Sequence, residues 1–140
     1  MKKILIAEDN PVNRELLREL LELRGYEVAE ACDGQEALTL IAQAQPDLLI
    51  LDLSMPVLDG FGVIRRLRAA PATARLRVLA ATAYAMRGDR EKVMEAGFDG
   101  YLSKPIDNTA LMVEVERMLG TEGIQKTSAA AAGAASNSSE

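Results

Sequence analysis

Apolar residues occur along the chain in two patterns that alternate with each other. Short continuous runs are typical of buried strands, and apolar residues at every third or fourth position are typical of amphipathic helices. The short runs predict strands over 3–7, 27–31, 48–52, 78–82 and 100–103. The helical pattern predicts helices from 11 to just before Gly25, over 36–44, between Gly60 and Pro71, over 87–96 and over 107–119. Five strand–helix units with short connections predict an α/β fold, a doubly wound sheet of parallel strands.

Most of the predicted helices have an apolar face that we expect to lie against the sheet. The residues assigned to these faces are Val12, Leu16, Leu20 and Leu23 with Leu17 and Leu21; Ala37, Leu38, Ile41 and Ala42; Val63, Ile64 and Leu67; and Leu111, Val115, Met118 and Leu119. In the third helix Arg65, Arg66 and Arg68 are expected to face solvent. From residue 121 the chain is rich in Ala, Ser and Gly, so we expect one domain over 1–120 and a flexible tail over 121–140.

Polar side chains follow four of the predicted strands at the point where each strand ends. They are Glu8 and Asp9, Asp52, Thr82 and Lys104. Each one alone has an ordinary structural explanation, and Asp52 alone would be explained best as a capping or turn residue. Because the carboxyl ends of parallel strands share one edge of a sheet, we expect the five side chains to converge there.

A pocket with three carboxylates needs a cation, because the carboxylates repel one another and raise at least one carboxyl pKa. Oxygen ligands favour a hard ion such as Mg²⁺ or Mn²⁺. A lysine and a hydroxyl beside that ion suit the oxygens of a phosphoryl group. The strand ends therefore favour a site that handles phosphate together with a divalent cation.

The composition removes several classes of function. None of the 140 residues is His, which excludes Ser-His and Cys-His nucleophile pairs and His-ligated metals. The formal net charge of −5 argues against nucleic-acid binding. Cys32 is the single cysteine, so no internal disulfide forms, and no apolar run suits a membrane span or a signal peptide. We expect a cytoplasmic protein.

With these motifs in order, the chain resembles the receiver domain of two-component response regulators. The resemblance rests on Glu8-Asp9-Asn10, Asp52, Met55-Pro56, Asp59-Gly60, Thr82-Ala83 and Lys104-Pro105, whose order and spacing extend over residues 2–119. The segment 81–89 is similar to single-domain receivers of the chemotaxis and cell-cycle type, and to receivers attached to hybrid sensor kinases. The resemblance implies a flavodoxin-like sheet with strand order 2-1-3-4-5 and five helices.

The resemblance also implies roles for individual residues. Asp52 would accept the phosphoryl group, while Asp9, Asp52 and the backbone carbonyl of Ser54 would bind Mg²⁺ or Mn²⁺, with Glu8 acting through a metal-bound water. Thr82, the backbone amide of Ala83 and Lys104 would hold the phosphoryl oxygens. Thr82 and Tyr101 would form the switch, and the peptide before Pro105 would be cis. Ser54 and Tyr84 would flank the approach of a hydrolytic water.

The implied function is a phosphorylation-dependent signalling switch that catalyses only its own phosphorylation and autodephosphorylation. Asp52 would take the phosphoryl group from a sensor histidine kinase or a histidine phosphotransfer protein, because a chain without His cannot be the donor. The phosphorylated form would bind a downstream protein through the fourth helix, the fifth strand and the fifth helix. Neither direct nucleic-acid binding nor membrane insertion is expected.

Other functions stay open at this point. A Mg²⁺-dependent phosphatase of the haloacid dehalogenase type also uses a strand-end Asp, but its second Asp corresponds to Ser54 here. A flavin-binding flavodoxin would need a Ser/Thr/Gly-rich loop where this chain has Glu8 to Pro11. A receiver-like module that binds proteins without taking phosphate is disfavoured by the intact set of site residues. A receiver module from a hybrid sensor kinase or a longer regulator is a further alternative.

Overall fold

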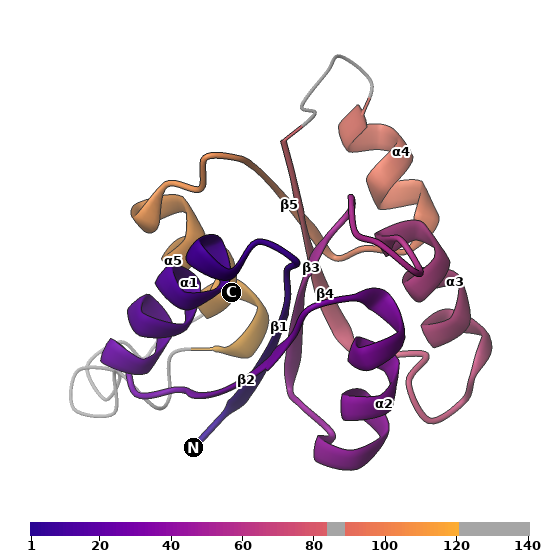
Figure 1. The fold of residues 1–140 in the computed structure, drawn as a ribbon, viewed down its shortest axis with the longest axis horizontal. Helices are drawn as coiled ribbons and strands as arrows, with labels where there is room; N and C mark the ends of the chain where they lie inside the picture. The colour runs from indigo at the N-terminus through magenta and orange to yellow at the C-terminus, as the bar shows by residue number, and fades with distance from the viewer. Residues whose placement is uncertain (84–88, 121–140) are drawn as a thin grey trace.

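A computed structural model of the chain describes residues 1–83 and 89–120. Five parallel strands form one sheet in the order β2-β1-β3-β4-β5, which confirms the predicted fold class and strand order. The elements are β1 (Lys3–Ala7), α1 (Pro11–Leu23), β2 (Glu27–Ala31), α2 (Gly34–Ala44), β3 (Leu48–Asp52), α3 (Gly60–Ala69), β4 (Arg77–Thr82), α4 (Asp89–Ala96), β5 (Gly100–Ser103) and α5 (Asn108–Leu119). Figure 1 shows α1 and α5 on one face of the sheet and α2, α3 and α4 on the other.

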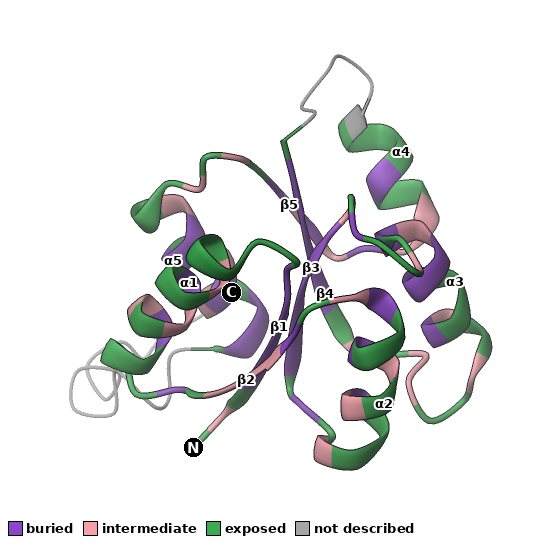
Figure 2. Cartoon of the chain, viewed as in Figure 1, coloured by how far each residue is buried: buried purple, intermediate pink, exposed green. Residues whose placement is uncertain are grey.

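Side chains of successive strand residues alternate between these two faces, and each face has its own core. The α2–α4 face contains Leu5, Ala7, Leu49, Leu51, Val78 and Ala80, whereas the α1/α5 face contains Ile4, Ile6, Leu48, Ile50, Leu79 and Leu102. Both sets are buried, so the central strands are apolar on both sides, as in other parallel sheets (Figure 2).

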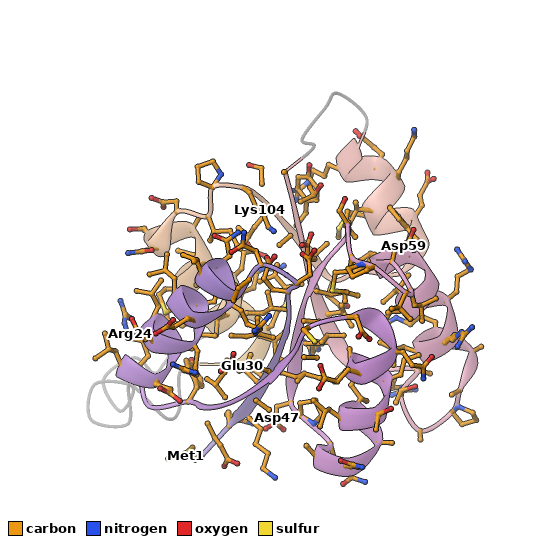
Figure 3. The ribbon with its side chains drawn as sticks, in the orientation of Figure 1. Met1, Arg24, Glu30, Asp47, Asp59 and Lys104 are labelled. Atoms are coloured by element: carbon orange, nitrogen blue, oxygen red, sulfur yellow. The ribbon has the colours of Figure 1, made fainter. Side chains whose placement is uncertain are left out.

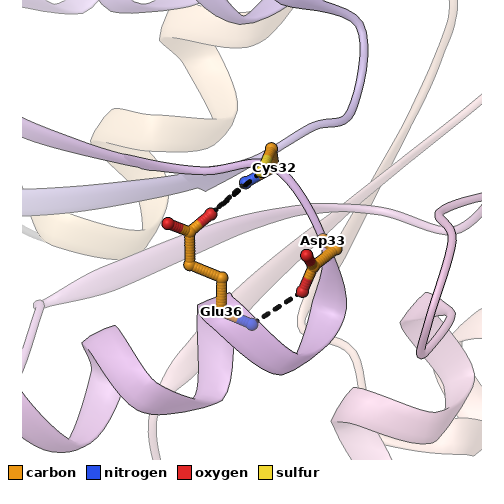
Figure 4. A group of neighbouring side chains, drawn as sticks. All are labelled: Cys32, Asp33 and Glu36. Carbon is orange, nitrogen blue, oxygen red and sulfur yellow. Dashed lines mark hydrogen bonds between the residues drawn. The ribbon is translucent and has the colours of Figure 1, made fainter.

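Four of the helices begin at a side chain that accepts hydrogen bonds from the first turn, namely Asn10, Asp33, Asp59 and Asp107. The cap at Asp33 places the start of α2 at Gly34, two residues earlier than predicted. Figure 4 shows this cap, together with the Glu36 carboxylate, which accepts from the backbone amide of Cys32 at 2.7 Å. Gly34 has no room for a side chain, because a β-carbon there would meet the backbone carbonyl of Leu58.

The predicted inward face of α1 is partly wrong. Leu17 and Leu21 are buried, but Val12, Leu16 and Leu23 are exposed. Ala42 of α2 is likewise exposed rather than buried. The apolar stripe of α1 is wider than the part of the helix that the sheet can cover, so its outer members remain at the surface.

Arg68 of α3 also departs from the prediction that it faces solvent. Its guanidinium donates to the backbone carbonyl of Gly97 at 2.9 and 2.7 Å, to that of Leu76 at 2.7 Å, and to the Asp99 carboxylate at 3.0 Å. Arg65 and Arg66 are exposed, as predicted. Arg68 therefore fastens the end of α3 to the starts of β4 and β5.

Three predictions fall partly or wholly outside the described residues. They are the start of the fourth helix at 87–88, the role of Tyr84, and the flexible tail over 121–140. Within the described ranges, no helix combines the length and the apolar character that crossing a membrane requires.

Candidate functional site

The predicted site residues follow strands that end at the same edge of the sheet, which we call the carboxyl edge. Glu8, Asp52 and Lys104 each stand an even number of residues after strand residues of the α1/α5 core. These core residues are Ile4 and Ile6 in β1, Leu48 and Ile50 in β3, and Leu102 in β5. The alternation therefore directs these three side chains toward the α1/α5 face. Figure 3 shows Lys104 at this edge, with Asp47 and Met1 at the opposite end of the molecule.

Lys104 lies between the two buried acids. Its Nζ is 2.6 Å from Oε1 of Glu8 and 3.1 Å from Oδ2 of Asp52. Glu8 and Asp52 are only 2% and 4% exposed. The other oxygen of each acid accepts a backbone amide: Oε2 of Glu8 from Asn10 at 3.1 Å, and Oδ1 of Asp52 from Ser54 at 3.1 Å. All four carboxylate oxygens are thus held in defined directions.

The charges in this pocket change the pKa values of two groups. Burial raises the pKa of Glu8, and repulsion by Asp52 adds to the effect, against the opposing hydrogen bond from Lys104. Burial acts to lower the pKa of Lys104, but its hydrogen bonds with Glu8 and Asp52 outweigh burial, so that pKa is raised. The lysine therefore keeps its positive charge and partly neutralises the buried acids.

The carboxylates fit a divalent cation. Glu8, Asp9 and Asp52 each offer an oxygen, and these oxygens lie within 4.8 Å of one another. Asp9 is exposed, whereas Glu8 and Asp52 are buried, so the cluster opens toward solvent at Asp9. Two or three carboxylates beside open positions for water are what Mg²⁺ prefers. The donor set, made of oxygen alone, fits Mg²⁺ or Mn²⁺ and suits no soft metal.

Thr82 is the last residue of β4, the strand that pairs with β3, and is 3% exposed. In the register of the sheet Ala80 pairs with Tyr101 and Thr82 pairs with Ser103. Thr82 and Tyr101 therefore point to the same face of the sheet, the face covered by α4. Ala83 follows at the surface, and the Lys104–Pro105 peptide is cis, the conformation that the resemblance implies.

The loop between β3 and α3 contains a strained turn that the sequence analysis missed. Val57 has a φ of 71°, and the amide of Leu58 donates to the carbonyl of Pro56 at 2.7 Å. A γ-turn with positive φ at its centre is rare, and a β-branched residue there is strained. Val57 is also 78% exposed, so packing does not offset the strain. A Met-Pro pair followed by Asp-Gly signals a turn but not its handedness.

A second group with possible ligand atoms is Cys32, Asp33 and Glu36 (Figure 4). Its hydrogen bonds account for it as the N-terminal cap of α2: Asp33 accepts from the amide of Glu36 at 2.8 Å, and Glu36 accepts from Cys32. The group is therefore explained by helix capping.

Comparison with known proteins agrees with this geometry. The model of the response regulator receiver domain family matches residues 4–116. The chain belongs to the receiver domain family. The polar-differentiation response regulator DivK of Brucella anthropi is 36% identical over 119 residues, which cover 85% of this chain and 97% of that protein. The family assignment removes the phosphatase and flavodoxin alternatives.

Solved receiver domains have the same fold. The receiver domain of a sensor histidine kinase from Pseudomonas aeruginosa, solved with magnesium coordinated in its active-site cleft, matches with a TM-score of 0.78 and 36% identity, covering 85% of this chain and 98% of that one. The chemotaxis response regulator CheY4 of Vibrio cholerae matches with a TM-score of 0.79 and 30% identity, covering 85% and 99%. This receiver domain is a signalling protein of the two-component class, related to single-domain regulators.

Proposed function

We propose that this receiver domain accepts a phosphoryl group from a phosphohistidine onto Asp52 and that the modified form binds a downstream protein. The proposal rests mainly on one observation: a buried Asp52 carboxylate, held by Lys104 and by the Ser54 amide, beside two further acids. A structural sheet does not need this arrangement, whereas transfer of a charged phosphoryl group does.

In the transfer step a carboxylate oxygen of Asp52 forms a bond to phosphorus while the bond from phosphorus to the donor imidazole breaks. The electron pair of the broken bond returns to the imidazole nitrogen. Lys104 moves its hydrogen bonds from the acids to the phosphoryl oxygens, and Thr82 and the amide of Ala83 bind the other oxygens. Because the transition state is loose, positioning and charge neutralisation supply most of the catalysis.

Asp9, Asp52 and the carbonyl of Ser54 would hold Mg²⁺ or Mn²⁺, with Glu8 acting through a water. When bound, the cation supplies charge neutralisation between the acids and the incoming phosphoryl oxygens. The cluster of three acids supports this assignment, because Lys104 bonds with only two of them and a second positive charge would offset the remaining negative charge.

The phosphohistidine donor, a sensor histidine kinase or a histidine phosphotransfer protein, would approach over α1. A groove of about 360 Å³ beside the site is lined by Leu16, Leu20, Lys104, Pro105 and Ile106, among others. Leu16 is 53% exposed, so apolar surface is available beside the phosphoacceptor. An apolar helical partner would bury this surface and bring its histidine to Asp52. We propose a cytoplasmic location for this reaction.

The readout would use the α4, β5 and α5 surface. Thr82 and Tyr101 lie on the same face of the sheet, so a movement of Thr82 toward the phosphoryl group changes the space available to the Tyr101 ring. Met94 of α4 and Val113 of α5 are exposed apolar residues on these elements. A downstream protein would distinguish the two states by this surface.

Labelling by a phosphohistidine donor tests the phosphoacceptor. We expect the wild type to take label in the presence of Mg²⁺ and the Asp52→Asn variant to take none. Asp59→Asn is the matched control, because Asn also caps helices well and this residue caps α3 outside the pocket. Equal labelling of wild type and Asp52→Asn would refute the proposal, as would an unlabelled wild type.

Thr82→Ala tests the switch separately from the chemistry. We expect this variant still to be labelled, because Asp52 and Lys104 remain, but its affinity for a downstream protein should no longer rise on phosphorylation. The measurement compares the partner affinity of phosphorylated and unphosphorylated forms. The same phosphorylation-dependent gain in wild type and variant would exclude Thr82 from the switch.

A further inference from the structure

The loop Glu8–Asn10 presents two of the three acids, and its backbone is held at several points. The amide of Glu8 donates to the carbonyl of Ala31 at 3.0 Å, which continues the pairing of β1 with β2. The carbonyl of Asn10 accepts from the amide of Arg14 at 3.0 Å, at the first turn of α1. These bonds belong to the sheet and to the helix and fix the two ends of the loop.

The side chain of Arg14 adds a bond to the loop itself. Its Nη1 donates to the backbone carbonyl of Glu8 at 2.8 Å, and its Nε donates to Oε1 of Glu30 at 3.0 Å. A guanidinium is planar and presents its donors in a fixed fork, so these two bonds set the distance between the loop and β2. The Arg14 side chain is 20% exposed and that of Glu30 is 27% exposed, so water screens the pair only in part.

Arg18 provides a natural comparison, because it shares Glu30 without holding the loop. Its Nη1 donates to Oε2 of Glu30 at 2.6 Å. Within the described part of the chain Arg18 has no hydrogen bond to the Glu8–Asn10 loop. Arg14 and Arg18 thus carry the same charge, lie one turn apart on α1 and contact the same carboxylate, but only Arg14 reaches a metal-ligand loop.

We propose that Arg14 is a positioning residue for the divalent cation: it fixes the Glu8 carbonyl so that the Glu8 and Asp9 carboxylates face Asp52. This inference rests on the proposed function, which assigns a cation to these acids. Partners outside the ligand set commonly orient metal ligands in this way, and their loss typically lowers metal affinity by about 10–100-fold.

Position and charge predict opposite effects of Arg14, which makes the proposal testable. If Arg14 acted through charge alone, its positive charge would repel Mg²⁺, and removing that charge would tighten Mg²⁺ binding. If Arg14 acts through position, a lysine that keeps the charge but cannot make both bonds would weaken Mg²⁺ binding. Loss of the Arg14 side chain therefore raises Mg²⁺ affinity if its charge matters and lowers Mg²⁺ affinity if its position matters.

The experiment measures Mg²⁺ affinity by calorimetry for wild type, Arg14→Lys, Arg14→Met and Arg18→Lys. We expect Arg14→Lys to weaken Mg²⁺ binding by about tenfold, and Arg14→Met to weaken it less, because the lost charge partly compensates. Arg18→Lys should change the affinity by less than about twofold, because in the described part of the chain Arg18 bonds with Glu30 and not with the Glu8–Asn10 loop. Urea unfolding of each metal-free variant shows that the fold is retained.

The outcomes separate this inference from the proposed function. Unchanged Mg²⁺ affinity in Arg14→Lys, or an equal loss in Arg14→Lys and Arg18→Lys, overturns the positioning role while leaving phosphorylation of Asp52 intact. A wild type that binds no Mg²⁺ overturns both. If Arg14→Lys fails to fold, Glu30→Gln takes its place: it removes one end of the bridge, and we expect a weaker loss of Mg²⁺ affinity in the same direction, with no loss contradicting the proposal.

Discussion

At the amino edge of the sheet, where the strands begin, Arg68, Asp99 and Asp47 are matched with hydrogen-bond partners, whereas at the carboxyl edge three carboxylates lie together and Lys104 bonds with only two of them. Arg68 at the amino edge donates to Asp99, and Asp99 also accepts the amide of Val78 at 2.8 Å. Asp47 bonds with the backbone of Lys3 through both its side chain and its amide, each at 2.8 Å. Asp99 and Asp47 thus each have donors within the described part of the chain.

The carboxyl edge differs in charge and in backbone strain. Glu8, Asp9 and Asp52 carry more negative charge than Lys104 can neutralise, and Val57 forms a strained turn in the loop after β3. An arrangement that costs stability persists when function needs it. We therefore expect the amino edge to contribute stability and the carboxyl edge to cost stability, so single substitutions at the two edges should have effects of opposite sign.

Removing Arg68 should produce the largest effect. Arg68→Ala leaves several backbone carbonyls and the Asp99 carboxylate without their donor, so we expect a loss of roughly 2–3 kcal/mol in the free energy of unfolding. Arg66→Ala is the matched control on the same helix, with an expected change within about 0.5 kcal/mol. Urea unfolding measures both, and equal effects of the two variants would show that the amino edge is not held by this network.

Replacing Glu8 should act in the opposite direction. The pKa of Glu8 is raised from its ordinary value of 4.5, so its ionised form costs stability once the pH rises through the folded-state value. In metal-free protein we expect Glu8→Gln to be more stable than wild type at pH 7 by on the order of 1 kcal/mol. Below the ordinary pKa of 4.5 the Glu8 side chain is neutral in both the folded and the unfolded protein, so this advantage of Glu8→Gln should disappear.

Thermal unfolding of wild type and Glu8→Gln between pH 4 and pH 8, with a chelator present, measures this advantage. A difference in stability that does not change with pH would contradict the buried surplus of negative charge. A variant less stable than wild type at pH 7 would show that the carboxylate gains more from Lys104 than it loses by burial.

Relieving the turn at Val57 should give the smallest gain. Glycine adopts positive φ without steric cost but adds freedom to the unfolded chain, so we expect Val57→Gly to stabilise the protein by roughly 0.5 kcal/mol. Gln45, with a φ of 50° at the end of α2, provides the comparison at the amino edge. Because Gln is not β-branched, Gln45→Gly should gain less. If urea unfolding showed a larger gain in stability for Gln45→Gly than for Val57→Gly, the greater backbone strain would lie at the amino edge, contrary to this expectation.

The pattern of apolar residues predicts the strands and most helices of this chain. A strand that is buried on both faces of a parallel sheet is apolar at consecutive positions, as in Leu48–Leu51, and such a run is easily recognised. Periodicity fails where a helix carries more apolar residues than its neighbours cover: Leu16 belongs to the apolar stripe of α1 and is nevertheless exposed. It also fails for Arg68, whose long side chain reaches backbone carbonyls that no helical pattern encodes.

The candidate site was predictable because parallel topology brings strand ends together, so Glu8 and Lys104, 96 residues apart in the chain, are in contact. What holds these side chains was not predictable. The bond from Arg14 to the Glu8 carbonyl and the positive φ of Val57 depend on backbone direction, and neither residue type signals it.

Intact mass spectrometry after incubation with a small phosphoryl donor such as phosphoramidate shows whether Asp52 accepts a phosphoryl group. We expect a mass gain of one phosphoryl group in the wild type when Mg²⁺ is present. We expect no gain when Mg²⁺ is chelated and none in Asp52→Asn. A wild type that gains no phosphoryl group with Mg²⁺, or an Asp52→Asn variant that gains one, would contradict the assignment of the carboxyl edge as a phosphoacceptor site.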